Sequence, residues 1–308
     1  MRTGRIGQLE VSVVGLGCNN FGRALDKTQS AAVVDAALDA GMNHFDTASN
    51  YGEGRSESFL GAALGNRRDE VVIATKVGVA IPGWEGSGGA RPNYVRQVLE
   101  RSLTELGTDY VDLYMIHFPD QETPIEETLE VMGELVEEDM VREIGCSNFD
   151  LAQLTEALDV SGQKGWRSFV CDQVQYSMVH REPENNRLAR LCVERGVALL
   201  PFYPLASGLL TGKTRRGHEP QGRLKMDRYQ DFLTDENFDL VEALERFASE
   251  QGLTMVQVAL GWLLAQEAVP AVTAGATSPE QVAANARAAE WEPTAQELED
   301  LSAIIDMG

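Results

Sequence analysis

The chain contains 308 residues with 43% apolar content and a formal net charge of −22, from 48 acidic and 26 basic side chains. A chain of this length can bury a large core, either as one large domain or as two small ones. The excess of acidic residues argues against a nucleic acid or an anionic membrane as partner, because both attract basic surfaces.

No apolar run approaches the roughly 20 residues of a membrane span, and the N-terminal segment lacks the apolar core of a secretory signal. The four cysteines are widely spaced and form no C-x-x-C pair, a pattern typical of a reducing compartment. We therefore expect a cytoplasmic protein. The sequence leaves its oligomeric state open.

In chain order, a hairpin is expected over residues 5–11, where apolar residues alternate around a glycine. Short apolar runs then predict buried strands at residues 13–18, 42–48, 71–77, 111–118, 141–147, 169–176, 197–203 and 271–275. Helical patterns follow them at residues 28–41, 56–64, 92–106, 125–138, 151–160, 185–195, 236–251 and 254–266, from 279 and from 294. This alternation predicts an α/β fold with a parallel sheet. Its eight repeats favour one (β/α)8 TIM barrel over residues 1–308, with an N-terminal hairpin and extra C-terminal helices, over an open doubly wound sheet.

Ionisable residues stand at the ends of successive predicted strands. Asp46 and Lys76 come at the ends of the second and third strands, His117 near the end of the fourth, and Tyr51 in the loop after the second. A barrel would bring these side chains together, because the C-terminal ends of its strands form one face.

Together they suggest a proton donor. A phenol with a pKa near 10 must shift by up to about 3 units, or roughly 4 kcal/mol, to act near neutral pH. One ammonium at about 4 Å supplies that much at an effective dielectric constant near 20. We therefore predict that Lys76 lowers the pKa of Tyr51, that Asp46 orients Lys76, and that His117 binds the phenol or a substrate oxygen. Such a site suits reduction of a carbonyl by an external hydride.

Several segments in order carry a family resemblance. They are FDTASNYGEGRSE (residues 45–57), ATKVG (74–78), DLYMIHFPD (112–120), VREIGCSNF (141–149) and PLASGLLTGK (204–213). The chain resembles the aldo-keto reductases along its whole length. The resemblance implies a (β/α)8 barrel that binds NADPH or NADH without a Rossmann domain. It also implies a small carbonyl or alcohol substrate, with Tyr51 as the acid beside Asp46, Lys76 and His117.

The resemblance also implies cofactor-binding positions. Ser147, Asn148 and Gln173 match the residues that hold the nicotinamide carboxamide. Phe202 stands where the family has a Tyr or Trp that stacks on the nicotinamide, and Tyr203 replaces the usual Ser. The remaining matches, in the pyrophosphate loop, are Leu205, Ser207 and Gly208.

For the adenosine 2′-phosphate, Gly275 and Gln281 are neutral where many family members have Lys and Arg. The pattern of the branch that includes potassium-channel β subunits is matched instead by Lys213, Arg223, Thr277, Gln281 and Asn285. Two cations facing a dianionic phosphate favour NADPH over NADH, although a solvated basic loop would have the same composition.

Other features are less informative. Trp84, Phe21 and residues near Tyr229 are expected to wall the substrate pocket. The segment GLGCNNFG (residues 15–22) lacks the spacing of a dinucleotide-binding turn, and the scattered histidines predict no metal site. Two functions fit the sequence: a reductase of aldehydes or ketones, or a cofactor-bound regulatory or redox-sensor protein with slow turnover, as channel β subunits are.

Overall fold

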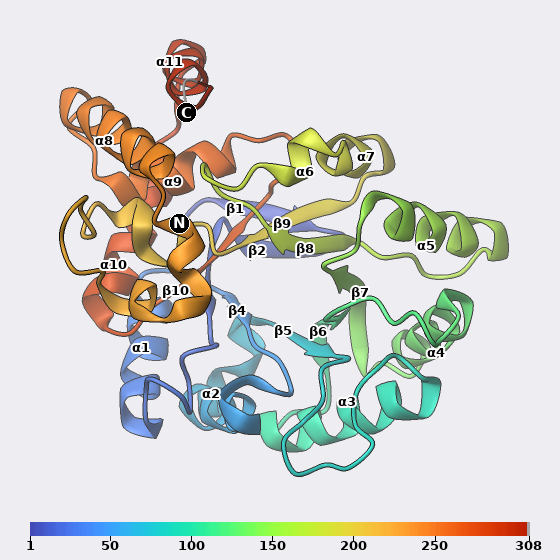
Figure 1. Ribbon diagram of the computed structural model, residues 1–308. Helices are drawn as coiled ribbons and strands as arrows, with labels where there is room; N and C mark the ends of the chain where they lie inside the picture. Colours follow the sequence, from blue (N-terminus) through green and yellow to red (C-terminus); the bar gives the residue numbers. More distant parts are fainter. Residues whose placement is uncertain (307–308) are drawn as a thin grey trace.

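The computed structural model describes residues 1–306 and contains a sheet of eight parallel strands in the order β10-β3-β4-β5-β6-β7-β8-β9. Its strands are β3 (Val14–Gly17), β4 (His44–Asp46), β5 (Val72–Val77), β6 (Val111–Ile116), β7 (Val141–Ser147), β8 (Cys171–Gln175), β9 (Ala198–Phe202) and β10 (Val272–Gly275). The end strands β9 and β10 lie side by side, and the Leu199 N–H donates to the Ala268 carbonyl at 2.8 Å. The sheet is therefore a nearly closed barrel, as Figure 1 shows.

The barrel interior is closed at one end. Alternate residues of a strand point to opposite faces, so one set from each strand fills the interior. The hairpin of β1 (Thr3–Ile6) and β2 (Leu9–Ser12) adds its apolar side chains to that interior. The shared cluster contains Ile6, Leu9, Val11, Val72, Ala74, Leu113, Met115, Cys171, Ala198, Leu200 and Ala271. Because the hairpin plugs the N-terminal end of the barrel, the C-terminal end is left for a site.

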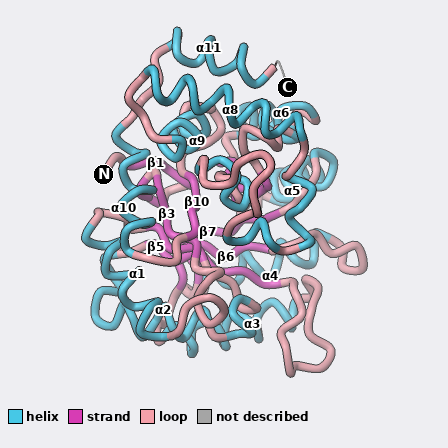
Figure 2. Tube along the Cα trace, turned by 60° about the vertical axis from the view of Figure 1, so that its left-hand side comes forward, coloured by secondary structure: helices cyan, strands magenta, loops and turns pink. Residues whose placement is uncertain are grey.

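Helices surround the strands (Figure 1) and bury the outer faces of the barrel in a second, larger core. They are α1 (Lys27–Asp39), α2 (Ser56–Leu64), α3 (Pro92–Leu106), α4 (Ile125–Glu137), α5 (Leu151–Lys164), α6 (Glu182–Asn185), α7 (Leu188–Arg195), α8 (Asp235–Glu250), α9 (Met255–Leu264), α10 (Pro279–Arg287) and α11 (Ala295–Ile305). Figure 2 shows α11 lying beside α8, outside the barrel. Among the helices of residues 1–306, none is both long and apolar enough to span a membrane.

The predicted barrel, hairpin and extra C-terminal helices are confirmed. One predicted helix is wrong, because residues 185–195 do not form a single helix. The helix is interrupted between α6 and α7, where Arg187 adopts a left-handed φ of 71°. The Leu188 N–H donates to the Asn186 side-chain oxygen at 3.0 Å, which forms an Asx turn directly before α7.

Candidate active site

Three strands and one turn bring the predicted ionisable residues together. Asp46 ends β4, Lys76 lies in β5, and His117 directly follows β6. The Lys76 ammonium donates to the Asp46 carboxylate at 2.6 Å and to the Thr47 carbonyl at 2.8 Å. Its nitrogen lies 5.0 Å from the centroid of the Tyr51 ring, and the rings of Tyr51 and His117 meet edge-on at 5.6 Å. The predicted grouping of these side chains therefore exists.

The position of Tyr51 depends on the 3-10 turn Tyr51–Gly54. Gly52 adopts a φ of 58°, and a Cβ at this position would lie 2.1 Å from the Phe21 carbonyl oxygen. Only glycine permits both this conformation and this close approach. The turn is thereby packed against the loop after β3.

The pKa of Tyr51 beside Lys76 differs from the prediction. Burial raises the pKa of Tyr51 above its ordinary value, and the charge of Lys76 offsets this only in part. The predicted net lowering of this pKa is therefore wrong for this site. Burial disfavours the phenolate, and Asp46 partly neutralises the Lys76 charge and itself raises the pKa of the phenol.

Lys76 and His117 have defined charge states. Burial alone would lower the pKa of Lys76, but Asp46 and Tyr51 raise it above its ordinary value, so the ammonium stays charged. Burial and the nearby Lys76 charge lower the pKa of His117 to about 3, so its ring is neutral near pH 7. The site thus holds a protonated phenol, a buried cation and a neutral imidazole.

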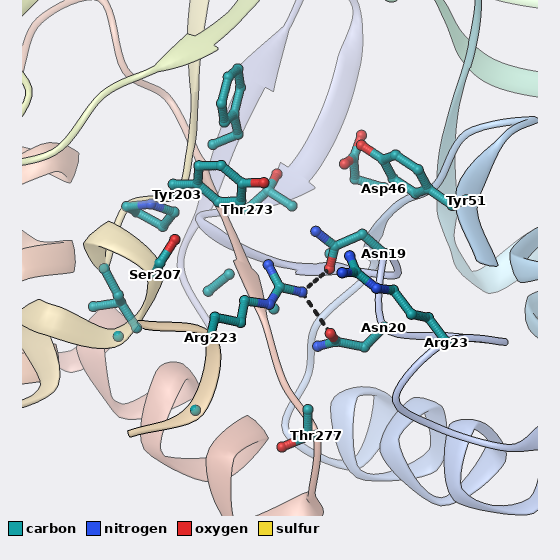
Figure 3. A pocket seen from close by; sticks show the side chains of 18 of the residues that line it. Asn19, Asn20, Arg23, Asp46, Tyr51, Tyr203, Ser207, Arg223, Thr273 and Thr277 are labelled. Carbon is teal, nitrogen blue, oxygen red and sulfur yellow. Dashed lines mark hydrogen bonds between the residues drawn. The ribbon is translucent and has the colours of Figure 1, made fainter. Parts of the chain in front are cut away.

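A cavity of about 1150 Å³ opens above these residues at the C-terminal ends of the strands. It is lined by Asp46, Tyr51 and His117, whereas Lys76 is fully buried beneath. Every residue predicted to bind cofactor also lines it: Ser147, Asn148, Gln173, Phe202, Tyr203, Leu205, Ser207, Gly208, Lys213, Arg223, Gly275, Thr277, Gln281 and Asn285. Segments from the whole chain therefore meet in one cavity, part of which Figure 3 shows.

The strand ends β7 and β8 carry a network of amides and a hydroxyl. Ser147 donates to the Gln173 carbonyl at 2.7 Å, and the Asn148 amide donates to the Ser147 hydroxyl at 3.0 Å. The same Asn148 amide group donates to the His117 carbonyl at 2.9 Å. Gln173 in turn donates to Asp46 at 3.3 Å, so this network is continuous with the Lys76 ion pair.

The loop after β9 has an unusual backbone. Tyr203, Ala206, Ser207 and Gly208 all have positive φ, at 51°, 46°, 57° and 108°. Non-glycine residues seldom adopt this conformation, and such strain is concentrated at ligand sites.

Four residues that line the cavity each have a buried polar side-chain atom without a protein partner among the described residues. They are Asn50 Oδ1, His117 Nδ1, Ser207 Oγ and Thr273 Oγ1. A buried polar group without a partner costs roughly 1–3 kcal/mol. Because these atoms have almost no accessible surface, a ligand in the cavity would pair with them only after their side chains rotate toward it.

Arg223 joins two loops across the cavity, as Figure 3 shows. Its guanidinium donates to Asn19 at 2.8 Å and to Asn20 at 2.6 Å. Lys213 lines the cavity and is exposed. Sequence reasoning missed Asn19, Asn20 and also Arg287, which lines the cavity from the end of α10. Two amides directly after a predicted strand were the signal for the first pair; Arg287 had none.

Two of the three predicted substrate walls, Phe21 and Trp84, do not line the cavity, whereas Arg228, next to Tyr229, does. Phe21 is 0% exposed and belongs to the core, so it has no surface for a ligand. Trp84 packs edge-on against Tyr94 at 5.5 Å and does not line the cavity. Phe118, which was not predicted, is 49% exposed, lines the cavity and stacks on His117 at 5.2 Å.

Residues 13–306 match the sequence profile of the Aldo/keto reductase family. The chain belongs to this family. A probable voltage-gated potassium channel subunit beta of Oryza sativa subsp. japonica is 33% identical, over 98% of this chain and 95% of that protein. The L-glyceraldehyde 3-phosphate reductase of Escherichia coli (strain K12) is 32% identical, over 91% of this chain and 84% of that protein. The aldo-keto reductase YhdN of Bacillus subtilis (strain 168) is 30% identical, over 97% of this chain and 91% of that protein.

No group of three or more His, Cys, Asp or Glu side chains in the described part of this aldo/keto reductase is arranged to hold a metal ion. The ionisable groups at the cavity floor are instead the buried pair of Lys76 and Asp46 with Tyr51 and His117.

Proposed function

We propose that the protein reduces aldehydes or ketones to alcohols, reversibly, with NADPH as the preferred cofactor and NADH as an alternative. The observation that carries the proposal is the buried ion pair of Lys76 and Asp46 at 2.6 Å, directly beside Tyr51 at the floor of the cavity. A buried ion pair contributes little to stability, because removing both charges from water offsets their attraction. Next to a phenol, it is suited to stabilising charge that develops in a reaction.

The cofactor, when bound, supplies a hydride to the carbonyl carbon. Tyr51 donates its phenolic proton to the carbonyl oxygen as negative charge grows there. Its raised pKa keeps the donor protonated before the reaction, and the Lys76 ammonium stabilises the phenolate that forms. The neutral His117 ring carries one N–H, which can donate to the same oxygen and orient it.

The cavity residues fit a nicotinamide dinucleotide. Ser147, Asn148 and Gln173 offer amide and hydroxyl groups for the carboxamide, and the Phe202 ring can stack on the nicotinamide. The unpartnered Ser207 hydroxyl and the strained backbone around it suit the pyrophosphate. Lys213 and Arg223 would meet the 2′-phosphate, with the other predicted adenosine residues around them: Gly275, Thr277, Gln281 and Asn285.

The direct test is to follow oxidation of NADPH and NADH at 340 nm with a panel of aldehydes and ketones, and to identify the alcohol product. We expect turnover that requires the carbonyl compound, with NADPH bound more tightly than NADH. A protein that binds NADPH but oxidises none with any carbonyl compound would contradict the proposal.

A second candidate is a cofactor-bound regulatory or redox-sensor protein. The match to a probable potassium channel subunit beta over 98% of this chain supports this second candidate. It predicts tight NADPH binding with very slow hydride transfer, and the same assay separates the two candidates.

A further inference from the structure

Cations are concentrated around the cavity, although the chain has a net charge of −22. Among the described residues, the cavity lining contains only two carboxylates, Asp46 and Glu53. Its cationic side chains are Arg23, Arg55, Lys213, Arg223, Arg228 and Arg287. In a strongly acidic protein, this concentration makes the cavity a site that attracts anions.

Part of this set lies on the Tyr51 side of the cavity. Arg55 donates to the Gly52 carbonyl at 2.9 Å, one residue after Tyr51. Gly22 packs closely against Arg55, because a Cβ on Gly22 would lie 2.8 Å from the Cβ of Arg55. Arg23 is the next residue in the chain and therefore lies beside Arg55. Figure 3 shows Arg23 on the same side of the cavity as Tyr51.

Arg228 reaches the same place from the loop after β9. Its Nη2 lies 3.9 Å from the Met226 sulfur, and the Nη2 of Arg23 lies 3.9 Å from that sulfur too. Arg228 also lies over the Tyr229 ring, whose hydroxyl hydrogen-bonds the Tyr203 hydroxyl at 3.0 Å. Two guanidinium groups from distant segments therefore meet at one thioether.

Neither of these two arginines has a carboxylate partner among residues 1–306. By contrast, Arg216 on the same loop pairs with three carboxylates, including Glu242 at 3.3 Å. A thioether is only a weak acceptor, and the two guanidinium groups repel each other. An anion between them would remove the repulsion and accept hydrogen bonds from both forks.

We propose that Arg23 and Arg228 bind an oxyanion of the substrate, so that the carbonyl compound carries a carboxylate or a phosphate monoester. The proposal rests on the proposed reductase function and names the substrate class of that site. The anion is held at the cavity mouth while the carbonyl group lies at Tyr51.

The test compares kcat/KM of the wild type and the Arg23→Gln/Arg228→Gln variant for 4-carboxybenzaldehyde, 4-formylphenyl phosphate and 4-nitrobenzaldehyde. The nitro group has the planar shape of a carboxylate without its charge, so the ratio between substrates isolates the charge. We expect the variant to lose about 100-fold for at least one anionic aldehyde, mainly through KM, and less than about threefold for the nitro compound. The larger loss identifies carboxylate or phosphate as the preferred anion.

Two controls separate other causes. The Arg215→Gln/Lys225→Gln variant also removes two positive charges, at exposed positions that do not line the cavity, and should change no ratio. An equal loss in this control would overturn the proposal in favour of long-range attraction. The Kd for NADPH should be unchanged in Arg23→Gln/Arg228→Gln; a weaker NADPH complex would overturn the proposal by assigning these arginines to the cofactor. A parallel loss for the nitro compound would also overturn it.

Failure of the reductase function can be recognised separately. Calorimetric titration with 4-carboxybenzyl alcohol in the presence of NADPH needs no turnover. Binding by the wild type and loss in Arg23→Gln/Arg228→Gln would support the anion site even if no aldehyde is reduced. No difference between the two proteins would overturn it.

Discussion

Replacement of Lys76 by Met should cost both stability and rate, for separable reasons. Lys76 has no exposed side-chain surface, and its partner Asp46 has 7%. Removing one partner of a buried ion pair leaves the other charge uncompensated, which costs about 3–5 kcal/mol. At the 5.0 Å between the Lys76 nitrogen and the Tyr51 ring centroid, loss of one charge removes about 3 kcal/mol at an effective dielectric constant of 20. That energy corresponds to roughly two orders of magnitude in the rate of reduction.

The double variant Lys76→Met/Asp46→Asn separates the two effects. It leaves no buried charge, so the free energy of unfolding in urea should recover most of the loss seen in Lys76→Met. The rate should stay low, because the phenolate of Tyr51 still has no cation beside it. A less than tenfold loss of kcat in Lys76→Met, or recovery of the rate in the double variant, would refute the reasoning.

Three further outcomes follow from the structure. Lys213→Ala/Arg223→Ala should raise the Kd for NADPH on the order of 100-fold and that for NADH less than about threefold, measured by fluorescence titration; equal losses would mean that Arg223 acts only as the tie to Asn19 and Asn20. Burial raises the pKa of Asp172 to about 7, so the folded state disfavours ionisation and loses stability as pH rises from about 4 through 7. Asp172→Asn should therefore gain about 3 kcal/mol relative to wild type between pH 5 and pH 8 in chemical unfolding, and a constant difference would contradict this origin. Since the pKa of Tyr51 is raised and that of His117 is lowered to about 3, kcat/KM for reduction should be flat from pH 5 to pH 9. A titration within this range would show that the pKa of one of these two groups lies inside it.

The barrel and the grouping of the ionisable residues could be predicted from sequence because both follow from local patterns. Strand-like apolar runs alternate with helical ones, and Asp46, Lys76 and His117 each come at the end of such a run. Once the strands form a parallel barrel, their C-terminal ends must meet. Of the cofactor residues implied by the family resemblance, Ser147, Phe202 and Gly275 end strands and line the cavity for the same reason.

The rest depends on packing between distant segments. The sign of the pKa shift at Tyr51 is set by its burial, which no spacing encodes. Phe21 and Trp84 both lie in loops that follow predicted strands, where an aromatic residue could be exposed. In the structure, Phe21 is buried in the core, Trp84 packs against Tyr94, and neither lines the cavity. The bonds from Arg223 to Asn19 and Asn20 join the loops after β9 and β3, which are about 200 residues apart.

The most direct test of the proposed chemistry is a stopped-flow measurement of NADPH oxidation by wild type and Tyr51→Phe with an activated aromatic aldehyde. The two proteins differ by one oxygen atom at the cavity floor. We expect rapid turnover by wild type, a loss of several orders of magnitude in Tyr51→Phe, and nearly equal Kd values for NADPH, because the hydroxyl acts in the transition state. A wild-type kcat in Tyr51→Phe would show that another group donates the proton.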